Sequence, residues 1–240
     1  MKIIKIMDKN IWAITKVNLK TIDTAYWIAG ITASVSIIQA IVFFILAANG
    51  VNFGSNETIS SGDALWLVPL FAGIFIPASN FKKIVNLGGK RNNFIWGSLV
   101  CYVILAAVIS LLNIIIYYTF DNIVIGSIEN YGVMNLIGVF GWIESGVVIT
   151  FFQQLAFLFL LATFTHTLTA TQDKWYGWCI DIIIVAIIAV FASIAPLRET
   201  LAWFFSLILF SAPYLQIPAC LILGGAIYLL NKPIFARKII

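Results

Sequence analysis

Long runs of apolar residues, separated by short polar segments, constrain this chain more than any other feature. A helix needs about 20 predominantly apolar residues to cross the hydrocarbon core of a bilayer. Because 62% of the residues are hydrophobic and only 10% are charged, a soluble fold could not bury this much apolar surface. We therefore predict an all-α membrane protein with six transmembrane helices. The six runs lie at residues 26–48, 64–81, 94–120, 145–168, 177–195 and 212–230.

The loops between these runs are too short to hold a second folded module, so we predict a single transmembrane domain over residues 1–240. Residues 1–25 would precede the membrane domain on the cytoplasmic side, residues 26–231 would form its six helices, and residues 232–240 would be a cytoplasmic tail. The three cysteines lie inside apolar runs without CxxC spacing, which predicts neither a disulfide framework nor a zinc site.

The basic residues lie on one side of the predicted spans. Residues 1–25 hold five of the 14, residues 82–93 hold four, Lys174 adds one and the tail from Lys232 holds three. Six crossings place all of these on one face, with Arg198 as the exception, whereas a seventh crossing would put the basic tail outside. Because cytoplasmic loops are rich in lysine and arginine, we predict both termini in the cytoplasm. The net charge of +4 then reflects topology and predicts no nucleic-acid partner.

Residues 8–22 combine a broad apolar face with interspersed lysines, the pattern of a helix that lies in the membrane interface. We predict an N-terminal amphipathic interfacial helix at this position. Its candidate residues are Ile11, Trp12, Ile14, Lys16 and Leu19.

The apolar stretch at residues 197–211 is too short to cross a bilayer comfortably. Proline suits the start of a helix, and Pro196 and Pro213 flank this stretch. We therefore predict a short re-entrant hairpin between helices 5 and 6, made of two short helices that dip into the outer leaflet. In the second run, Pro69 and Pro77 predict a kinked helix that its neighbours support.

The start of the fourth span is ambiguous, because the segment 121–144 mixes polar and apolar residues. If the helix begins at Ser145, Glu144 is a solvated loop residue. If it begins near Asn135, Glu144 is a half-buried carboxylate at membrane depth. Ionisable groups inside a membrane are costly and tend to be functional, so the second alternative would make Glu144 a pathway residue.

Few polar side chains fall inside the predicted spans. Uncharged polar groups at this depth usually form hydrogen bonds between helices, and contact with a transported substrate is the alternative. The candidate pathway residues are Gln39, Glu144, Gln153 and Gln154. The one histidine, His166, is expected to be a hydrogen-bonded residue near the cytoplasmic end of the fourth span. With a single histidine and no paired carboxylates, the sequence predicts neither a metal site nor an intramembrane enzyme.

The stretch Gly88-Gly89-Lys90-Arg91 is the nearest approach to a phosphate-binding loop. It lacks the earlier glycine and the Ser/Thr that such a loop needs, so we expect no ATP site in this chain. Together with Phe94, however, these residues fit the pattern Gly-x-x-Arg-x-x-Phe, and Gly97 follows. In this pattern, in its amphipathic N-terminus and in its six spans, the chain resembles a permease subunit of the ABC-2 type, the membrane half of bacterial ATP-driven exporters.

This resemblance implies a coupling loop that docks on a separate ABC ATPase subunit, where ATP and Mg²⁺ would bind. The implied docking residues are Phe81, Lys82, Lys83, Leu87, Gly88, Gly89, Lys90 and Arg91. The chain itself would be no enzyme and would bind no cofactor.

The resemblance further implies a bacterial cytoplasmic membrane protein that pairs with a second permease copy, as a homodimer or a related heterodimer. Spans one, two and five would line a pathway for an amphipathic or hydrophobic cargo, such as an antimicrobial or cytolytic peptide. The hairpin would form an outer gate, with candidate residues Arg198, Glu199, Trp203 and Phe204. A secondary transporter, a channel or a polytopic accessory protein without an ATPase is the alternative.

Overall fold

The computed structural model describes residues 2–51, 56–127 and 131–236. Within these residues, six segments are long and apolar enough to cross a membrane, which agrees with the predicted all-α, multi-pass membrane protein. Each of them overlaps one predicted run, and their ends differ by a few residues. The segments are Asp23–Ala48, Ser61–Asn86, Arg91–Gly126, Val147–Thr171, Trp175–Ser193 and Pro213–Ala236.

The first helix, α1 (Lys2–Thr21), leads through Ile22 into the first span, α2 (Asp23–Ala48). The second span is interrupted, as its prolines predict. It consists of α3 (Ser61–Ala64), α4 (Leu67–Phe75), a π-helical turn (Ile76–Asn80) that contains Pro77, and α5 (Phe81–Asn86).

The third span is α6 (Arg91–Ile116), which continues through a second π-helical turn (Tyr117–Asp121) into α7 (Asn122–Ser127). The remaining spans are α9 (Val147–Thr171), α10 (Trp175–Ser193) and α12 (Pro213–Leu229), and the short α13 (Asn231–Ala236) follows α12. The helix α11 (Ala195–Leu209) joins α10 to α12.

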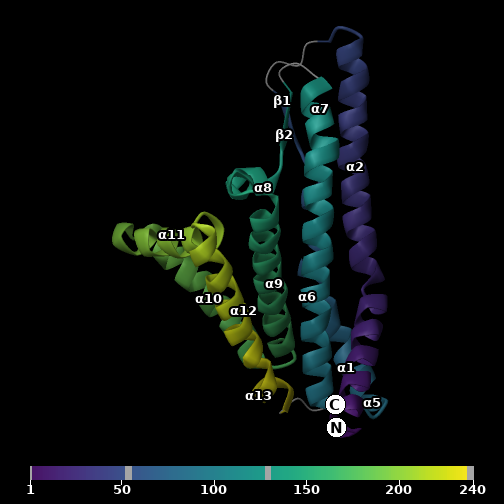
Figure 1. Ribbon diagram of the computed structural model, residues 1–240. Coiled ribbons are helices and arrows are strands. Elements are labelled where there is room, and N and C mark those ends of the chain that lie inside the picture. Colours follow the sequence, from purple (N-terminus) through teal and green to yellow (C-terminus); the bar gives the residue numbers. More distant parts are fainter. Residues whose placement is uncertain (1, 52–55, 128–130, 237–240) are drawn as a thin grey trace.

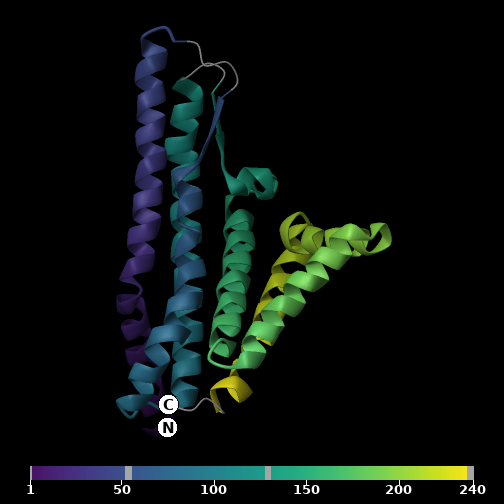
Figure 2. The same ribbon diagram turned by 180° about the vertical axis from the view of Figure 1, so that it is seen from behind.

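The helix α9 lies at the centre of the bundle, where α4, α6 and α12 pack against it. The group of α10, α11 and α12 leans away from α6, and α11 lies across the ends of α10 and α12 (Figure 1 and, from behind, Figure 2). The helices α2 and α10 lie on the outside, since only 6% of the most apolar stretch of each is buried.

The helices α1, α5 and α13 lie at one end of the bundle (Figure 1). We call this the basic end. Lys82 and Lys83 belong to α5, Lys232 to α13, Lys90 to the loop between α5 and α6, and Arg91 to the start of α6.

At the opposite end, the far end, β1 (Asn56–Ile59) pairs in parallel with β2 (Tyr131–Met134), with Asn56 opposite Tyr131. This small strand pair was not predicted. It is followed by α8 (Leu136–Val139) and a 3-10 turn (Trp142–Ser145).

The segment between the fifth and sixth spans differs from the prediction, because it forms the single helix α11 and not two short helices. Ile194 is extended (φ −102°, ψ 117°), which ends α10, and Pro196 then occupies the first turn of α11. No glycine or proline follows between residues 197 and 209, so nothing interrupts the new helix. Pro213 begins α12, as predicted for a proline at a helix start.

The fourth span begins at Val147, close to the first of the two predicted positions. Gly146 precedes it with φ +86°, a conformation that glycine adopts readily and that separates α9 from the preceding turn. Asn135 instead caps the separate α8 by accepting a hydrogen bond from the Ile137 amide at 3.0 Å. Glu144 is therefore exposed in the turn before α9, so it is a loop residue and not a half-buried carboxylate.

Candidate functional site

The turn after α5 has the geometry of a Schellman motif, a common way to end a helix. Gly88 has φ +85°, its amide donates to the Val85 carbonyl at 2.9 Å, and the Gly89 amide donates to the Ile84 carbonyl at 2.9 Å. A Cβ atom at Gly89 would lie 2.7 Å from the Ile84 oxygen, closer than real Cβ atoms come to other heavy atoms. Both glycines of the predicted coupling loop are thus required by the backbone.

Helix α5 has one buried and one exposed face. Phe81 and Ile84 point into the protein, with 0% and 8% of their surface exposed. Lys82 and Lys83 are exposed, and Leu87 is 88% exposed, unusually high for a leucine next to a packed core. The predicted coupling residues therefore form an anchored helix that presents two lysines and one leucine outward at the basic end.

Phe81 anchors α5 in a cluster of aromatic rings. Its ring centroid lies 4.4 Å from that of Phe235 on α13 and 5.2 Å from that of Phe94 on α6. His166 on α9 lies 5.7 Å from Phe235, and its Nδ1 is 2.5 Å from the Tyr102 hydroxyl. The prediction of a hydrogen-bonded His166 is confirmed, although this side chain is fully buried. We call this cluster the aromatic corner; it comprises Phe81, Phe94, Tyr102, His166, Tyr228 and Phe235.

Arg91 has an internal role that the sequence did not indicate. Its guanidinium donates from Nη1 to the carbonyls of Phe235 at 2.9 Å and Ala236 at 2.6 Å. The last turn of a helix has carbonyl groups without intrahelical partners, and a nearby cation suits them. Arg91 therefore ties the start of α6 to the end of α13. The three fixed residues of the Gly-x-x-Arg-x-x-Phe pattern thus have structural roles. Gly88 ends α5, Arg91 ties α6 to α13, and Phe94 belongs to the aromatic corner.

The first π-helical turn places Asn80 beside α1. The Asn80 amide donates to Asn18 Oδ1 at 3.0 Å and also to the Thr21 hydroxyl. Asn18 in turn donates to the Ser98 hydroxyl on α6 at 3.1 Å, and Thr15 donates to the Gly97 carbonyl at 3.0 Å. A chain of buried hydrogen bonds thus joins α1, the turn before α5, and α6.

The buried side of α1 differs from the predicted apolar face. Ile14 is buried and packs on Gly97, where a Cβ atom would lie 2.7 Å from its Cγ2. Ile11 and Leu19 are only partly buried, whereas the polar residues Thr15 and Asn18 are fully buried. Trp12 and Lys16 are exposed, and the Lys16 amine lies 5.8 Å from the Trp12 ring centroid. The helix itself is confirmed, and it packs on α6 through a mixed face.

The second π-helical turn places Asp121 in a buried polar cluster at the far end. Asp121 Oδ2 accepts from the Ser60 hydroxyl at 2.7 Å and from the Asn135 amide at 3.0 Å, and that amide also lies 3.3 Å from Asn113 Oδ1. Asp63 accepts from the Leu136 amide at 3.0 and 3.1 Å. We call this set the far-end polar cluster; it comprises Ser60, Asp63, Asn113, Asp121 and Asn135.

Several atoms in and near this cluster have no hydrogen-bond partner within the part of the chain that the structure describes. They include Asp121 Oδ1 and Asn113 Nδ2, and neither residue is exposed. Neither Asp63 nor Asp121 forms an ion pair with a described residue. Burying a carboxylate without a cation is costly, and intramembrane carboxylates are functional by default. The cluster is therefore a second candidate site, and it was not predicted from the sequence.

The four predicted pathway residues do not form one lining. Gln39 is exposed on α2, and Glu144 is exposed at the far end. Gln153 and Gln154 are buried on α9, where Gln153 donates to Gln216 Oε1 on α12 at 2.6 Å. For Gln153, this bond matches the first of the two expected roles, a hydrogen bond between helices, and not contact with a transported substrate. Neither amide atom of Gln154 has a hydrogen-bond partner among the described residues.

The predicted gate residues lie on α11. Arg198 and Glu199 are exposed in its first turns, and Trp203 and Phe204 are 65% and 40% exposed. Trp142 holds the C-terminal end of α11, because its indole donates to the Leu209 carbonyl at 2.7 Å.

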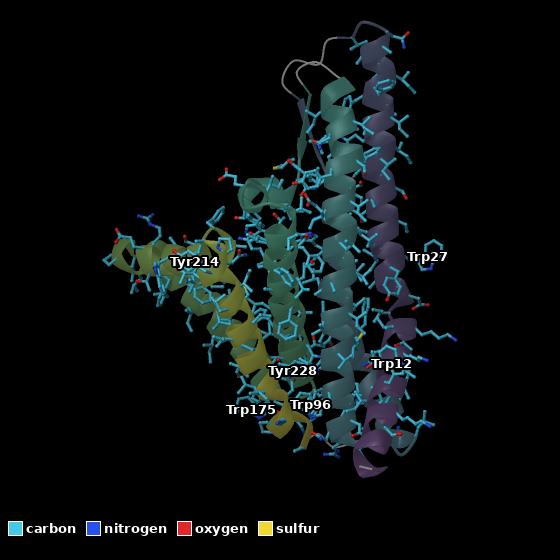
Figure 3. The ribbon with its side chains drawn as sticks, viewed as in Figure 1. Trp12, Trp27, Trp96, Trp175, Tyr214 and Tyr228 are labelled. Carbon is cyan, nitrogen blue, oxygen red and sulfur yellow. The ribbon has the colours of Figure 1, made fainter. Side chains whose placement is uncertain are left out.

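Exposed aromatic side chains lie near the ends of the spans, as expected for an interfacial belt. Trp175 is 78% exposed and lies with Trp96 towards the basic end, whereas Trp27 and Tyr214 lie further towards the far end (Figure 3).

Comparison with known proteins gave no relative: no protein-family model, no curated protein and no solved structure matches the chain.

Proposed function

We propose that this chain is the transmembrane permease subunit of an ATP-driven exporter of the ABC-2 type, in a bacterial cytoplasmic membrane. The observation that carries the proposal is α5, a short helix at the basic end that is anchored on one side and exposed on the other. Its exposed Lys82, Lys83 and Leu87 offer two positive charges and one apolar side chain to a partner. In this proposal the partner is a separate ATPase subunit that binds ATP and Mg²⁺.

The contacts of α5 suit a helix that transmits motion. Asn80 joins its start to α1, and Phe81 joins it to α6 and α13 through the aromatic corner. Because protein interiors are close-packed, a push on α5 would move these helices together and not deform the loop alone. The ATPase would then change the access of a pathway between the spans without any bond chemistry in this chain.

The exposed faces of α2 and α10 support a second permease copy beside this one. Only 6% of the most apolar stretch of each helix is buried, so the remaining apolar surface must be covered by lipid or by protein. In the proposed dimer, α2, α10 and the second span line the pathway, and α11 is the outer gate. An apolar lining favours an amphipathic or hydrophobic cargo, such as an antimicrobial or cytolytic peptide.

The far-end polar cluster favours a second candidate function, a cation-coupled secondary transporter. Such proteins use intramembrane carboxylates to bind the coupling ion, and Asp63 and Asp121 are buried within candidate spans. This candidate needs no ATPase, so the two functions differ in what must accompany the chain.

Affinity purification of the full chain from its native membrane in mild detergent tests the proposal. We expect an ABC ATPase to be recovered, and the double variant Lys82→Glu with Lys83→Glu to lose it, because both lysines face outward. Lys174→Glu, which reverses a charge outside the proposed docking helix, should retain it. Recovery of no ATPase from the unaltered chain, or equal loss in the Lys174 variant, would contradict the docking role of α5.

A further inference from the structure

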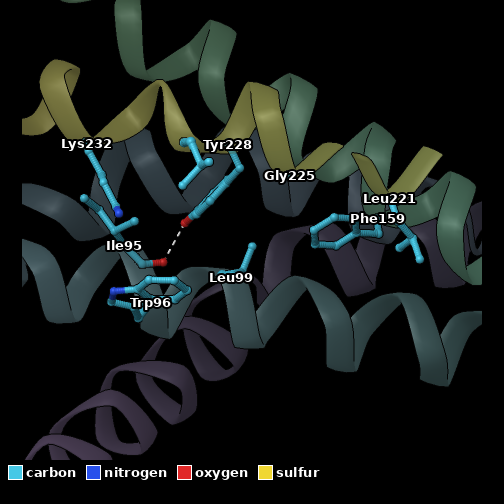
Figure 4. A pocket seen from close by; sticks show the side chains of 9 residues that line it. Ile95, Trp96, Leu99, Phe159, Leu221, Gly225, Tyr228 and Lys232 are labelled. Atoms are coloured by element: carbon cyan, nitrogen blue, oxygen red, sulfur yellow. Dashed lines mark hydrogen bonds between the residues drawn. The ribbon is translucent and has the colours of Figure 1, made fainter. Parts of the chain in front are cut away.

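The helices α6 and α12 both pack on α9 and leave a groove between them. Near the basic end they meet, because the Tyr228 hydroxyl on α12 donates to the Ile95 carbonyl on α6 at 2.6 Å. The groove beside this contact has a volume of about 230 Å³, and Phe159 of α9 forms part of its lining (Figure 4). We call it the α6–α12 groove; its lining is Ile95, Trp96, Leu99, Phe159, Leu221, Gly225, Tyr228, Leu229 and Lys232.

The lining suits a hydrocarbon chain. All of its side chains except Lys232 are apolar or aromatic, and the one hydroxyl, on Tyr228, is already bonded to Ile95. Gly225 keeps the groove open, since nothing lies within 4 Å of the position a Cβ atom would take. The volume is below the roughly 300–1,000 Å³ of pockets that hold whole small molecules, so one unbranched chain fits it better than a globular ligand.

A positive charge stands at one end of this groove. The Lys232 amine lies 5.6 Å from the Trp96 ring centroid, and both side chains lie at the basic end of the groove (Figure 4). Lys232 is exposed, and it forms no ion pair with a described residue. Tryptophan and lysine at the end of a span are typical of the level where lipid headgroups lie.

We propose that the α6–α12 groove holds one acyl chain of an anionic phospholipid from the leaflet at the basic end, with its phosphate beside Lys232. The apolar lining selects the chain, and the lysine selects the charge of the headgroup. This inference does not depend on ATP-driven export, because it requires only that α6 and α12 face lipid.

A second apolar groove provides an internal comparison. It lies between α2 and α6 and has a volume of about 290 Å³, and its lining includes Gly30, Tyr26 and Leu112 but no charged residue. We expect lipid chains there as well, but without a preference for anionic headgroups.

Native mass spectrometry of the full chain can measure the lipid that stays bound after extraction from vesicles. The vesicles contain equal amounts of phosphatidylglycerol and phosphatidylcholine with the same acyl chains. The unaltered chain should retain one tightly bound phosphatidylglycerol. Lys232→Gln should lower the preference for it about fivefold, the effect expected for one basic residue at a membrane surface. Lys174→Gln, a change at a lysine that does not line the groove, should leave the preference unchanged.

Gly225→Leu should displace the retained lipid, whatever its headgroup, because leucine fills the groove. It should not disturb folding, since nothing lies within 4 Å of the position that its Cβ atom would take. Gly30→Leu fills the second groove and should leave the retained phosphatidylglycerol in place. The inference is overturned if Lys232→Gln keeps the preference, if Lys174→Gln loses it equally, or if Gly225→Leu retains the lipid. A change of oligomeric state in Gly225→Leu with the lipid retained would assign the groove to a protein contact.

Discussion

Replacing Asn80 with alanine tests whether the turn before α5 is held to α1 by buried hydrogen bonds. The Asn80 amide donates to Asn18 Oδ1 and to the Thr21 hydroxyl, and both asparagines are buried. Alanine removes both bonds and leaves Asn18 Oδ1 without this donor. The helix itself should persist, because alanine has the highest helix propensity.

The expected loss of stability follows from these contacts. Side-chain hydrogen bonds in membrane proteins average about 0.6 kcal/mol each, so two bonds contribute about 1.2 kcal/mol. A buried acceptor left without a partner costs a further 1–3 kcal/mol, roughly. The Thr21 hydroxyl keeps its own bonds to the carbonyls of Val17 and Asn18, so it adds no such cost. We therefore expect Asn80→Ala to lower the free energy of unfolding by about 2–4 kcal/mol.

Reversible unfolding of the full chain in mixed micelles measures this change. Asn86→Ala is the matched control, because Asn86 is exposed at the end of α5 and should change stability by less than about 0.5 kcal/mol. A double-mutant cycle with Asn18→Ala should give a coupling energy of about 1 kcal/mol. The reasoning is refuted if Asn80→Ala behaves like the control, or if the two changes add within about 0.3–0.5 kcal/mol, as independent sites do.

Three further changes test other contacts. Gly88→Ala should destabilise the chain by about 1–2 kcal/mol, because its φ of +85° is costly for alanine, and an unchanged unfolding midpoint would contradict the assigned helix end. Asn135→Ala should lower the free energy of unfolding by about 2–4 kcal/mol, because it removes the bonds that hold the far-end polar cluster. In the same measurement Asp121→Asn should be near neutral, because asparagine keeps an acceptor and removes a buried charge. Trp142→Phe should increase hydrogen exchange in the last turns of α11, and equal exchange in both proteins would show that the indole bond does not hold this helix.

The spans could be predicted because hydrophobicity reports directly on membrane crossing. Each predicted run overlaps one of the six apolar segments, and prolines correctly indicated the interruption of the second span and the start of α12. The prediction of two short helices between the fifth and sixth spans was wrong. Flanking prolines mark where a helix can begin, but only an internal breaker would divide residues 197–209, and there is none.

The far-end polar cluster was missed because its carboxylates stand at the edges of apolar runs. The second predicted run begins at Ala64 and the third ends at Phe120, so Asp63 and Asp121 each lie one residue outside a predicted span. Their burial depends on the strand pair and on the second π-helical turn, and no local pattern predicts either feature. Two carboxylates directly beside long apolar runs were the available signal.

The resemblance implied one shared role for its docking residues, and the contacts of these residues in the structure differ from one another. The resemblance implied that Arg91 is a docking residue, and in the structure its guanidinium donates to the carbonyls at the end of α13. Such a bond joins positions 144 residues apart, so the local sequence carries no trace of it. Likewise, the buried polar residue Asn18 of α1 is explained by its hydrogen bond to Asn80, which is 62 residues away in the sequence.

The central claim is that an ATPase subunit docks on α5, and photo-crosslinking from Leu87 in the native membrane tests it most directly. A photoreactive side chain at Leu87 would project outward, since 88% of the residue is exposed. We predict a crosslink to an ABC ATPase from this position and none from Glu199 on α11, which is exposed in the part of the bundle that faces away from the basic end. Crosslinks from Leu87 to lipid alone, or to the same ATPase from both positions, would contradict the claim.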